Sequence, residues 1–180
     1  MPEFFETYSE SGDPTGLVPR DIVHRDGLWH QSANVFLIRS SGHLVIQQRQ
    51  STKDVCPDLW DLSVAEHLQP GETFQEGARR GLKEELGVAI ARLTEADAVR
   101  RVKLEIPALG VKDYELQQSF IAWSDAPVIP QADEVAATRE IDVEELQHLL
   151  ESAADQLTPW FIQSLQAIDI TSHMRGGSSG

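Results

Sequence analysis

The stretch from Glu72 to Val88, ETFQEGARRGLKEELGV, limits the fold more than any other part of this sequence. Thr73 and Glu76 have the Thr-x-x-Glu spacing of a helix capping box, and Gly87 stands where helices commonly end in the left-handed conformation. The apolar residues at every fourth position are Phe74, Ala78 and Leu82. Since residues four apart share one face of a helix, the stretch predicts an amphipathic helix over 73–87 that packs on a sheet.

The sequence before this helix favours strands. Residues 35–38 and 44–46 are rich in β-forming side chains and are separated by the polar RSSGH, which predicts a hairpin. The segment LWDLSVAEHL predicts another short extended stretch. Residues 1–29 carry turn signals at SGDPTG and VPRD, from which we expect a short strand, a turn and an extended run.

The sequence after the helix predicts more strands and then more helices. Residues 98–124 alternate as two strands joined by ALGVKD, and 136–141 predict a last strand. Asp142 is placed to cap a helix from Val143 to about Ala153. Thr158 and Pro159 predict the start of a final helix. This order of elements indicates an α/β fold in which helices sandwich a mixed sheet.

The length and composition are those of one globular domain. The chain has 180 residues, of which 41% are hydrophobic and 24% charged, so a sizeable core is available. We expect a single domain over residues 1–172. The end of the chain, RGGSSG, is small and polar, and we expect residues 173–180 to form a flexible tail.

The charge balance argues against nucleic acid as a partner. Acidic residues outnumber basic ones by 29 to 15, for a formal net charge of -14, and such a surface repels polyanions. Clustered carboxylates are, in contrast, the hard oxygen donors that Mg²⁺, Mn²⁺ and Ca²⁺ prefer.

The single cysteine, Cys56, excludes an internal disulfide and a thiolate zinc cluster. We therefore expect a protein of the reducing cytoplasm. No window is long and apolar enough to cross a membrane, and the first residues lack the pattern of a signal peptide. Membrane attachment is not expected.

The carboxylates of the predicted helix follow a recognisable pattern. The sequence GETFQEGARRGLKEELGV resembles the Nudix box, with Glu72, Arg80, Leu82, Glu84 and Glu85 in register and Gly87 and Val88 completing it. This resemblance implies the Nudix α/β/α sandwich with a mixed sheet, in which the box forms a loop, a helix and a loop. It also implies a divalent metal ion, Mg²⁺ or Mn²⁺. The alternative for the charges alone is a solvated helix face.

Two positions depart from the Nudix box. Glu66 stands at the opening glycine, and Gly81 stands at the glutamate after the arginine. The family's glutamate usually helps to bind the metal. With Gly77, Gly81 also places two glycines inside one helix, at a cost of about 1 kcal/mol each relative to alanine. Either the helix needs the room or the carboxylate is no longer needed.

A second resemblance covers most of the chain. VPRDIVHRDGLWHQSANVFLI, QQRQSTKDVCPDLWDLSVAEHLQPGE and KDYELQQSFIAW resemble the isopentenyl-diphosphate isomerase-like branch of the Nudix superfamily. True isomerases carry a catalytic cysteine before Gly-His, whereas this chain has Ala65, Glu66 and His67. This departure makes isomerase activity a less favoured interpretation of the resemblance.

The same resemblance implies a second group of metal ligands. The isomerase metal site corresponds here to His24, His30, His67, Asp113 and Glu115. Asp113 and Glu115 are two apart, which directs both carboxylates to one side of a strand. His24 and His30 lie six apart in a segment that we expect to be extended, so a loop would have to bring them together. The alternative is that these histidines hydrogen-bond to the backbone.

Other residues are candidates for substrate contacts. The resemblance to the Nudix family implies that Glu134, or its neighbour Asp133, reaches the active site from a loop, although a surface acid is the simpler alternative. Arg49 and Lys53 are candidates for phosphate contacts. Trp29, Trp60 and Trp123 are candidates for stacking, or else core residues.

The sequence therefore predicts a metal-dependent hydrolase that cleaves a nucleoside diphosphate or another diphosphate linked to a further group. Its expected partner is a small diphosphate, and weak activity is expected because of Gly81. The predicted catalytic residues are Glu84, Arg80 and Glu134, and the predicted metal ligands are Glu85, Glu84, Glu115 and His67. The alternatives are a non-catalytic diphosphate-binding or nucleotide-binding module and, less favoured because of Ala65, an isomerase. The oligomeric state is left open.

Overall fold

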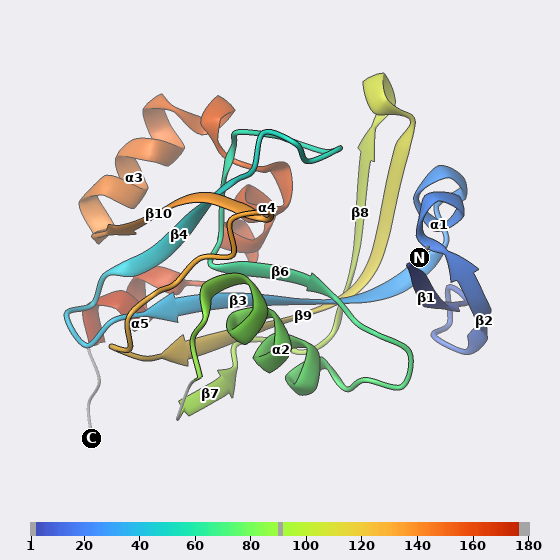
Figure 1. The fold of residues 1–180 in the computed structure, drawn as a ribbon, viewed down its shortest axis with the longest axis horizontal. Coiled ribbons are helices and arrows are strands. Elements are labelled where there is room, and N and C mark those ends of the chain that lie inside the picture. The colour runs from blue at the N-terminus through green and yellow to red at the C-terminus, as the bar shows by residue number, and fades with distance from the viewer. Residues whose placement is uncertain (1–2, 90–91, 177–180) are drawn as a thin grey trace.

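The structure, a computed structural model, describes residues 3–89 and 92–176. Its strands are β1 (Phe4–Tyr8), β2 (Pro14–Pro19), β3 (Trp29–Ile38), β4 (Leu44–Arg49), β5 (Trp60–Asp61), β6 (Val64–His67), β7 (Arg92–Glu95), β8 (Arg100–Ile106), β9 (Val111–Trp123) and β10 (Val135–Ile141). Its helices are α1 (Arg20–Asp26), α2 (Phe74–Leu86), α3 (Val143–Ser152), α4 (Pro159–Ala167) and α5 (Ile170–Gly176), with 3₁₀ turns at Pro107–Leu109 and Ala154–Gln156 (Figure 1).

Strand β3 is the centre of a mixed sheet. It runs parallel to β9 from the pair Trp29 and Tyr114 to the pair Ile38 and Trp123. It runs antiparallel to β4 and β6, while β10 and β5 pair with β4, and β7 and β8 pair with β9. Strands β1 and β2 form a small antiparallel ribbon at one end. In Figure 1 this ribbon and α1 lie together at one end of the molecule.

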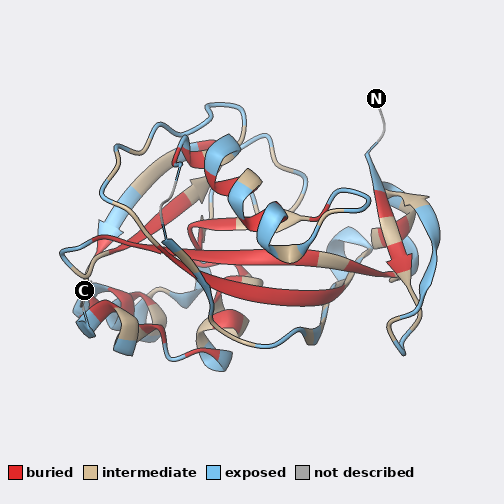
Figure 2. Ribbon diagram, turned by 90° about the horizontal axis from the view of Figure 1, so that it is seen from below, coloured by how far each residue is buried: buried red, intermediate tan, exposed pale blue. Residues whose placement is uncertain are grey.

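Helices cover both faces of this sheet. Helix α2 packs on one face, over a core that includes Val35, Leu37 and Phe120. Helices α3, α4 and α5 cover the other face, over Phe36 and Ile38. Adjacent residues of β3 thus point into the cores on opposite faces of the sheet, as the alternation of a strand requires. Figure 2 shows the buried strands between the two helical layers. The predicted α/β/α sandwich with a mixed sheet is confirmed.

Helix α2 begins and ends as its sequence predicts. The Thr73 side chain accepts from the backbone of Glu76, the Glu76 side chain accepts from the backbone of Thr73, and Gly87 adopts a left-handed conformation with φ of 67°. Its two internal glycines lie against β6 and Leu68, the residue that follows β6. A Cβ atom at Gly77 would lie 3.1 Å from Leu68, and one at Gly81 would lie 2.5 Å from Val64. Both glycines therefore provide room for close helix-to-strand packing.

Other predicted elements were confirmed, and four were missed. The hairpin is β3 and β4, residues 98–124 contain β8 and β9, and β10, α3 and α4 lie where they were expected. Missed were α1, β7, α5 and the full length of β3. Asp21 in the first turn of α1, His24 and Arg25 in its last turn and the left-handed Gly27 are ordinary helix signals. The expectation of an extended segment from His24 to His30 was wrong, because α1 and Gly27 turn the chain between them.

The predicted tail, 173–180, overlaps α5. This helix continues to Gly176, and Met174 is buried against the core. Residues 177–180 lie outside the described residues. Within the described part of the chain, no helix is long and apolar enough to cross a membrane.

Candidate active site

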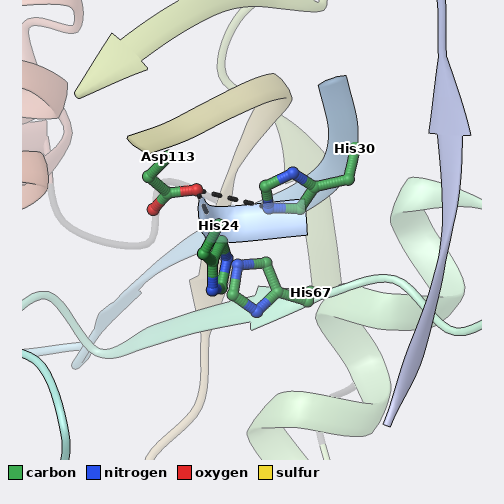
Figure 3. A group of neighbouring side chains, drawn as sticks. All are labelled: His24, His30, His67 and Asp113. Carbon is green, nitrogen blue, oxygen red and sulfur yellow. Dashed lines mark ion pairs between the residues drawn. The ribbon is translucent and has the colours of Figure 1, made fainter. Parts of the chain in front are cut away.

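Three histidines and an aspartate converge from four elements. His24 comes from α1, His30 from β3, His67 from β6 and Asp113 from β9. Each offers one ligand atom, and these four atoms all lie within 4.8 Å of one another. Asp113 Oδ1 lies 3.3 Å from Nε2 of His30 and 3.7 Å from Nε2 of His24 (Figure 3). We call these four residues the histidine cluster.

Several atoms of the histidine cluster are buried without a hydrogen-bond partner among the described residues. They are Nε2 of His24, Nε2 of His30 and Oδ1 of Asp113. His30 Nδ1 lies 3.0 Å from the carbonyl oxygen of Leu28. A carbonyl only accepts, so Nδ1 donates this bond, and in the neutral tautomer that binds metal Nε2 would offer its lone pair to the cluster. Buried polar atoms without partners are rare, and this set of nitrogen and oxygen donors fits a divalent transition-metal ion.

Glu115 extends the histidine cluster. Its Oε1 lies 3.3 Å from Nε2 of His67, and its Oε2 accepts from Nε2 of Gln117 at 2.8 Å. Burial by itself would raise the pKa of Glu115, but the hydrogen bond with His67 outweighs burial, and the pKa falls to about 2. Burial also opposes the charged form of His67, but Glu115 raises the pKa of that ring. His67 thus lies close to both Asp113 and Glu115, so these two carboxylates lie on one side of β9, as their spacing predicts.

The environment of His24 favours its neutral ring. Burial, and then the neighbouring His67 and His30, lower the pKa of His24 to about 3. The ring of Phe5 stacks on His30, with 5.2 Å between the ring centroids. A neutral imidazole is the form that binds metal. The structure thus brings together all five residues that the resemblance to the isomerases singled out.

Arg80 joins the carboxylates of the Nudix box to β6. Its Nε and Nη2 donate to the two carboxylate oxygens of Glu72 at 2.8 and 2.9 Å, and Nη2 also donates to the carbonyl oxygen of His67. Its Nη1 lies 3.1 Å from Oε2 of Glu66 and 3.3 Å from Oε2 of Glu84. One guanidinium therefore holds three carboxylates, since its donors are arranged in a rigid fork.

Glu85 is the most desolvated carboxylate of α2. Its Oε2 accepts from Nε2 of Gln47 at 2.7 Å. Burial, and next the charge of Glu66, raise the pKa of Glu85 to about 8. The negative form of this carboxylate is therefore unfavourable in the metal-free protein and would be stabilised by a bound cation.

This environment predicts a pH dependence for the metal-free protein. A carboxyl group whose pKa is raised on folding stabilises the protein below its ordinary pKa, and this contribution is lost as the pH rises from about 4.5 to about 8. Glu85→Gln cannot ionise, so we expect its melting temperature in EDTA to exceed that of the wild type by about 5 °C at pH 8.5, with no difference near pH 4.5. Circular dichroism melts across this range measure the difference. An equal or lower melting temperature at pH 8.5 would contradict the prediction.

A polar cavity of about 530 Å³ lies beside α2. Its lining includes the carboxylates of Glu66, Glu84 and Glu85 and the cations Arg20, Arg49 and Lys53. A second cavity adjoins it on the side of the histidine cluster and shares Arg20, Arg49, Val55, Ala65, Glu66 and His67 with it. One surface therefore combines carboxylates that could hold a metal with cations that could hold phosphate.

The other predicted residues have varied places. Glu134 lines the polar cavity and forms an ion pair with Lys53, whereas Asp133 is exposed outside it. The aromatic residue that lines the second cavity is Trp160. None of the three tryptophans considered for stacking, Trp29, Trp60 and Trp123, lines either cavity in the described structure.

Sequence reasoning missed three residues at these cavities. Arg20 gave no signal of its own, and Glu66 was noted only as a departure from the Nudix box. Trp160 directly follows a recognised helix start, but nothing in the spacing shows that its indole nitrogen donates to Asp61 at 2.8 Å. This contact joins residues 99 positions apart, so it depends on the tertiary fold.

Comparison with known proteins identifies the family of this chain. The family model described as the NUDIX domain matches residues 28–161. A protein of Nocardia farcinica named isopentenyl-diphosphate Delta-isomerase is 33% identical over 165 residues, covering 91% of this chain and 93% of that protein. An uncharacterized Nudix hydrolase of Clostridium acetobutylicum is 30% identical over 159 residues, covering 85% of this chain and 76% of that protein.

Solved structures show the same fold. The crystal structure of DR0079 from Deinococcus radiodurans has a TM-score of 0.65 and 24% identity, and the match covers 98% of this chain and 99% of that one. A MutT protein from Methanosarcina mazei has a TM-score of 0.59 and 17% identity, with coverage of 84% and 96%. The α/β/α sandwich, with the box carboxylates on α2, is thus the Nudix fold. This chain belongs to the Nudix family, and its relatives include proteins named as isomerases and as hydrolases.

Proposed function

We propose that this protein is a metal-dependent hydrolase of a small diphosphate linked to another group. The polar cavity carries this proposal, because it sets the carboxylates of Glu66, Glu84 and Glu85 within reach of the same space as Arg20, Arg49 and Lys53. Cations of this kind bind phosphate oxygens, and clustered carboxylates bind the hard divalent ions that accompany diphosphates.

The box carboxylates fit a hard ion such as Mg²⁺ or Mn²⁺. Glu84 and Glu85 are the residues that would hold it, and a bound ion would supply charge neutralisation at the phosphoryl oxygens. Arg80 orients Glu84 through the 3.3 Å contact of its Nη1. Glu84 and Glu134 are the candidate bases for a water molecule, since both carboxylates line the cavity and are partly exposed. Lys53 would break its ion pair with Glu134 and bind a phosphate oxygen instead.

The histidine cluster fits a second ion with different chemistry. His24, His30 and His67 offer nitrogen donors, with Asp113 and Glu115 beside them. Such a donor set favours Mn²⁺ or Zn²⁺ over Mg²⁺. His67 and Glu115 belong to this cluster and not to the group on α2, so the sequence-based set of Glu85, Glu84, Glu115 and His67 is best divided into two sites.

Hydrolysis of a panel of compounds tests the proposed function. The panel contains nucleoside and isoprenoid diphosphates and triphosphates, with Mg²⁺ or Mn²⁺, and release of phosphate or diphosphate is measured. We expect turnover of at least one compound, and we expect EDTA to abolish it. Glu85→Gln should reduce turnover roughly 100-fold or more, because it removes the most desolvated carboxylate of α2. Glu95→Gln, an exposed change on β7, is the matched control and should retain wild-type turnover.

The second candidate function is a non-catalytic module that binds a diphosphate. Gly81 favours it, because the α2 group lacks one carboxylate of the family's box. Saturable binding of panel compounds without turnover in wild type would establish this alternative and overturn the hydrolase.

Isomerisation is the least favoured function. Ala65 lines both cavities at the position where the resemblance to the isomerases implies a cysteine, and a methyl group cannot take part in proton transfer. Conversion of isopentenyl diphosphate to dimethylallyl diphosphate by the pure protein would reverse this conclusion.

A further inference from the structure

The space beside Gly81 is occupied by another carboxylate side chain. A Cβ atom at position 81 would lie 2.5 Å from Cγ1 of Val64, 3.1 Å from Cβ of Glu66 and 3.3 Å from Cγ of Glu66. A side chain at position 81 and the side chain of Glu66 therefore compete for one volume between α2 and β6.

The alternation of β6 explains why Glu66 faces α2. Val64 and Leu68 belong to the core beneath this helix, and Glu66 lies between them at the same strand parity. Ala65 and His67 have the opposite parity, and His67 joins the histidine cluster. Glu66 thus lies over Gly81, which is one helical turn before Glu84 and Glu85.

The carboxylate of Glu66 lies with those of the box helix. Its side chain is only 18% exposed and contacts Nη1 of Arg80 at 3.1 Å, the same atom that contacts Glu84 at 3.3 Å. Glu66, Glu84 and Glu85 line the same polar cavity. The donors are all oxygens, which is the chemistry that Mg²⁺ requires.

Arg80 does not need Glu66 in order to be held in place. Glu72 binds the guanidinium through both carboxylate oxygens at 2.8 and 2.9 Å, and the carbonyl oxygen of His67 accepts a further bond at 2.9 Å. An additional partly buried carboxylate at Arg80 is therefore not explained by anchoring of the arginine alone.

From this arrangement we infer that Glu66 supplies the metal-binding carboxylate that position 81 lacks. The two departures from the Nudix box are then one exchange, in which a carboxylate has moved from α2 to β6 and the glycine makes room for it. This inference rests on the proposed metal-dependent function. It assigns a third ligand for the ion, next to Glu84 and Glu85.

Mg²⁺ binding to the full chain tests this assignment without any substrate. Isothermal titration with Mg²⁺ alone reports on the oxygen donors, because nitrogen donors bind this ion poorly. We expect Glu66→Gln to weaken Mg²⁺ binding about tenfold or more while the metal-free protein melts within a few degrees of wild type. Glu95→Gln should bind Mg²⁺ as wild type does. Unchanged Mg²⁺ affinity in Glu66→Gln would overturn the inference.

Moving the carboxylate back to α2 provides the second test. Gly81→Glu alone is expected to destabilise the protein, because its Cβ atom would meet Val64 at 2.5 Å. The triple variant Val64→Ala, Glu66→Gly, Gly81→Glu removes both obstacles. We expect the triple variant to bind Mg²⁺ at least tenfold more tightly than the double variant Val64→Ala, Glu66→Gly, which lacks a carboxylate at both positions. A folded triple variant without this gain would contradict the exchange of a carboxylate between positions 81 and 66. If the triple variant does not fold, the Mg²⁺ affinity of Glu66→Gln is the deciding measurement.

These results are separable from the test of hydrolysis. Mg²⁺ binding that depends on Glu66, with no turnover of any panel compound, would support the exchange and refute the hydrolase. Turnover that is lost in Glu85→Gln but normal in Glu66→Gln, with normal Mg²⁺ affinity, would support the hydrolase and refute the exchange.

Discussion

His30→Ala is expected to weaken the binding of Mn²⁺ by roughly 100-fold or more. Nε2 of His30 is buried without a hydrogen-bond partner among the described residues and lies 3.3 Å from Oδ1 of Asp113. Even the outer partners of metal ligands change affinity by about 10–100-fold when they are removed, so loss of a direct donor should do at least as much. Titration of the chain with Mn²⁺, followed by calorimetry, measures the change.

The matched control for this experiment is His148→Ala, which removes an exposed histidine of α3. It should bind Mn²⁺ as tightly as wild type. Wild-type binding should weaken as the pH falls, and because Glu115 raises the pKa of His67 above its ordinary value, protons should begin to compete for that imidazole above pH 6.5. The titration is done in excess Mg²⁺, which occupies the carboxylates of α2, and Mn²⁺ affinities for His30→Ala and wild type that agree within a factor of two would contradict an ion at the histidine cluster.

The second large effect is expected at Asp61, which is completely buried. Its Oδ1 accepts from Oγ1 of Thr158 at 2.9 Å and from Nε1 of Trp160 at 2.8 Å. Nη1 of Arg49 lies 3.6 Å from Oδ2. Burial raises the pKa of Asp61, and Arg49 opposes this effect. Asp61 therefore links β5 to the start of α4 and to a cation at the polar cavity.

Asp61→Ala should destabilise the protein by about 3–5 kcal/mol, because it leaves the donors of Thr158 and Trp160 without their acceptor and removes the charge that faces Arg49. For a chain of this size we expect the melting temperature to fall by about 10 °C or more. Asp155→Ala, at an exposed site before α4, is the control and should change it by no more than about 2 °C. If Asp61→Ala melted within 2 °C of wild type, the buried network would contribute little.

Much of the fold was predictable because its signals are local. The capping box of Thr73 and Glu76 and the left-handed Gly87 define α2 through groups a few residues apart. The alternation of residues 98–124 predicted β8 and β9. Strand β7 is short and largely exposed, so it has no alternating core pattern. Helix α1 was missed because its seven residues bury only Val23, which is too few for an apolar stripe.

The candidate site was predictable only in part. The spacing of Arg80, Glu84 and Glu85 placed them together, because a helix converts a sequence interval into a fixed face. The residues of the histidine cluster were suggested by resemblance, but their meeting depends on α1, Gly27 and the parallel pairing of β3 with β9. No periodicity within one element brings such residues together.

By itself, the sequence determined the helix with the carboxylates of the Nudix box, most of the strands and helices around it, the acidic charge and the residue types available at the candidate site. Only the tertiary structure decided that Glu66 fills the space at Gly81 and that His24, His30, His67 and Asp113 converge. The physical reason is that side-chain direction along one helix or strand follows from local backbone geometry. Which elements lie against one another is decided by packing across the whole sheet.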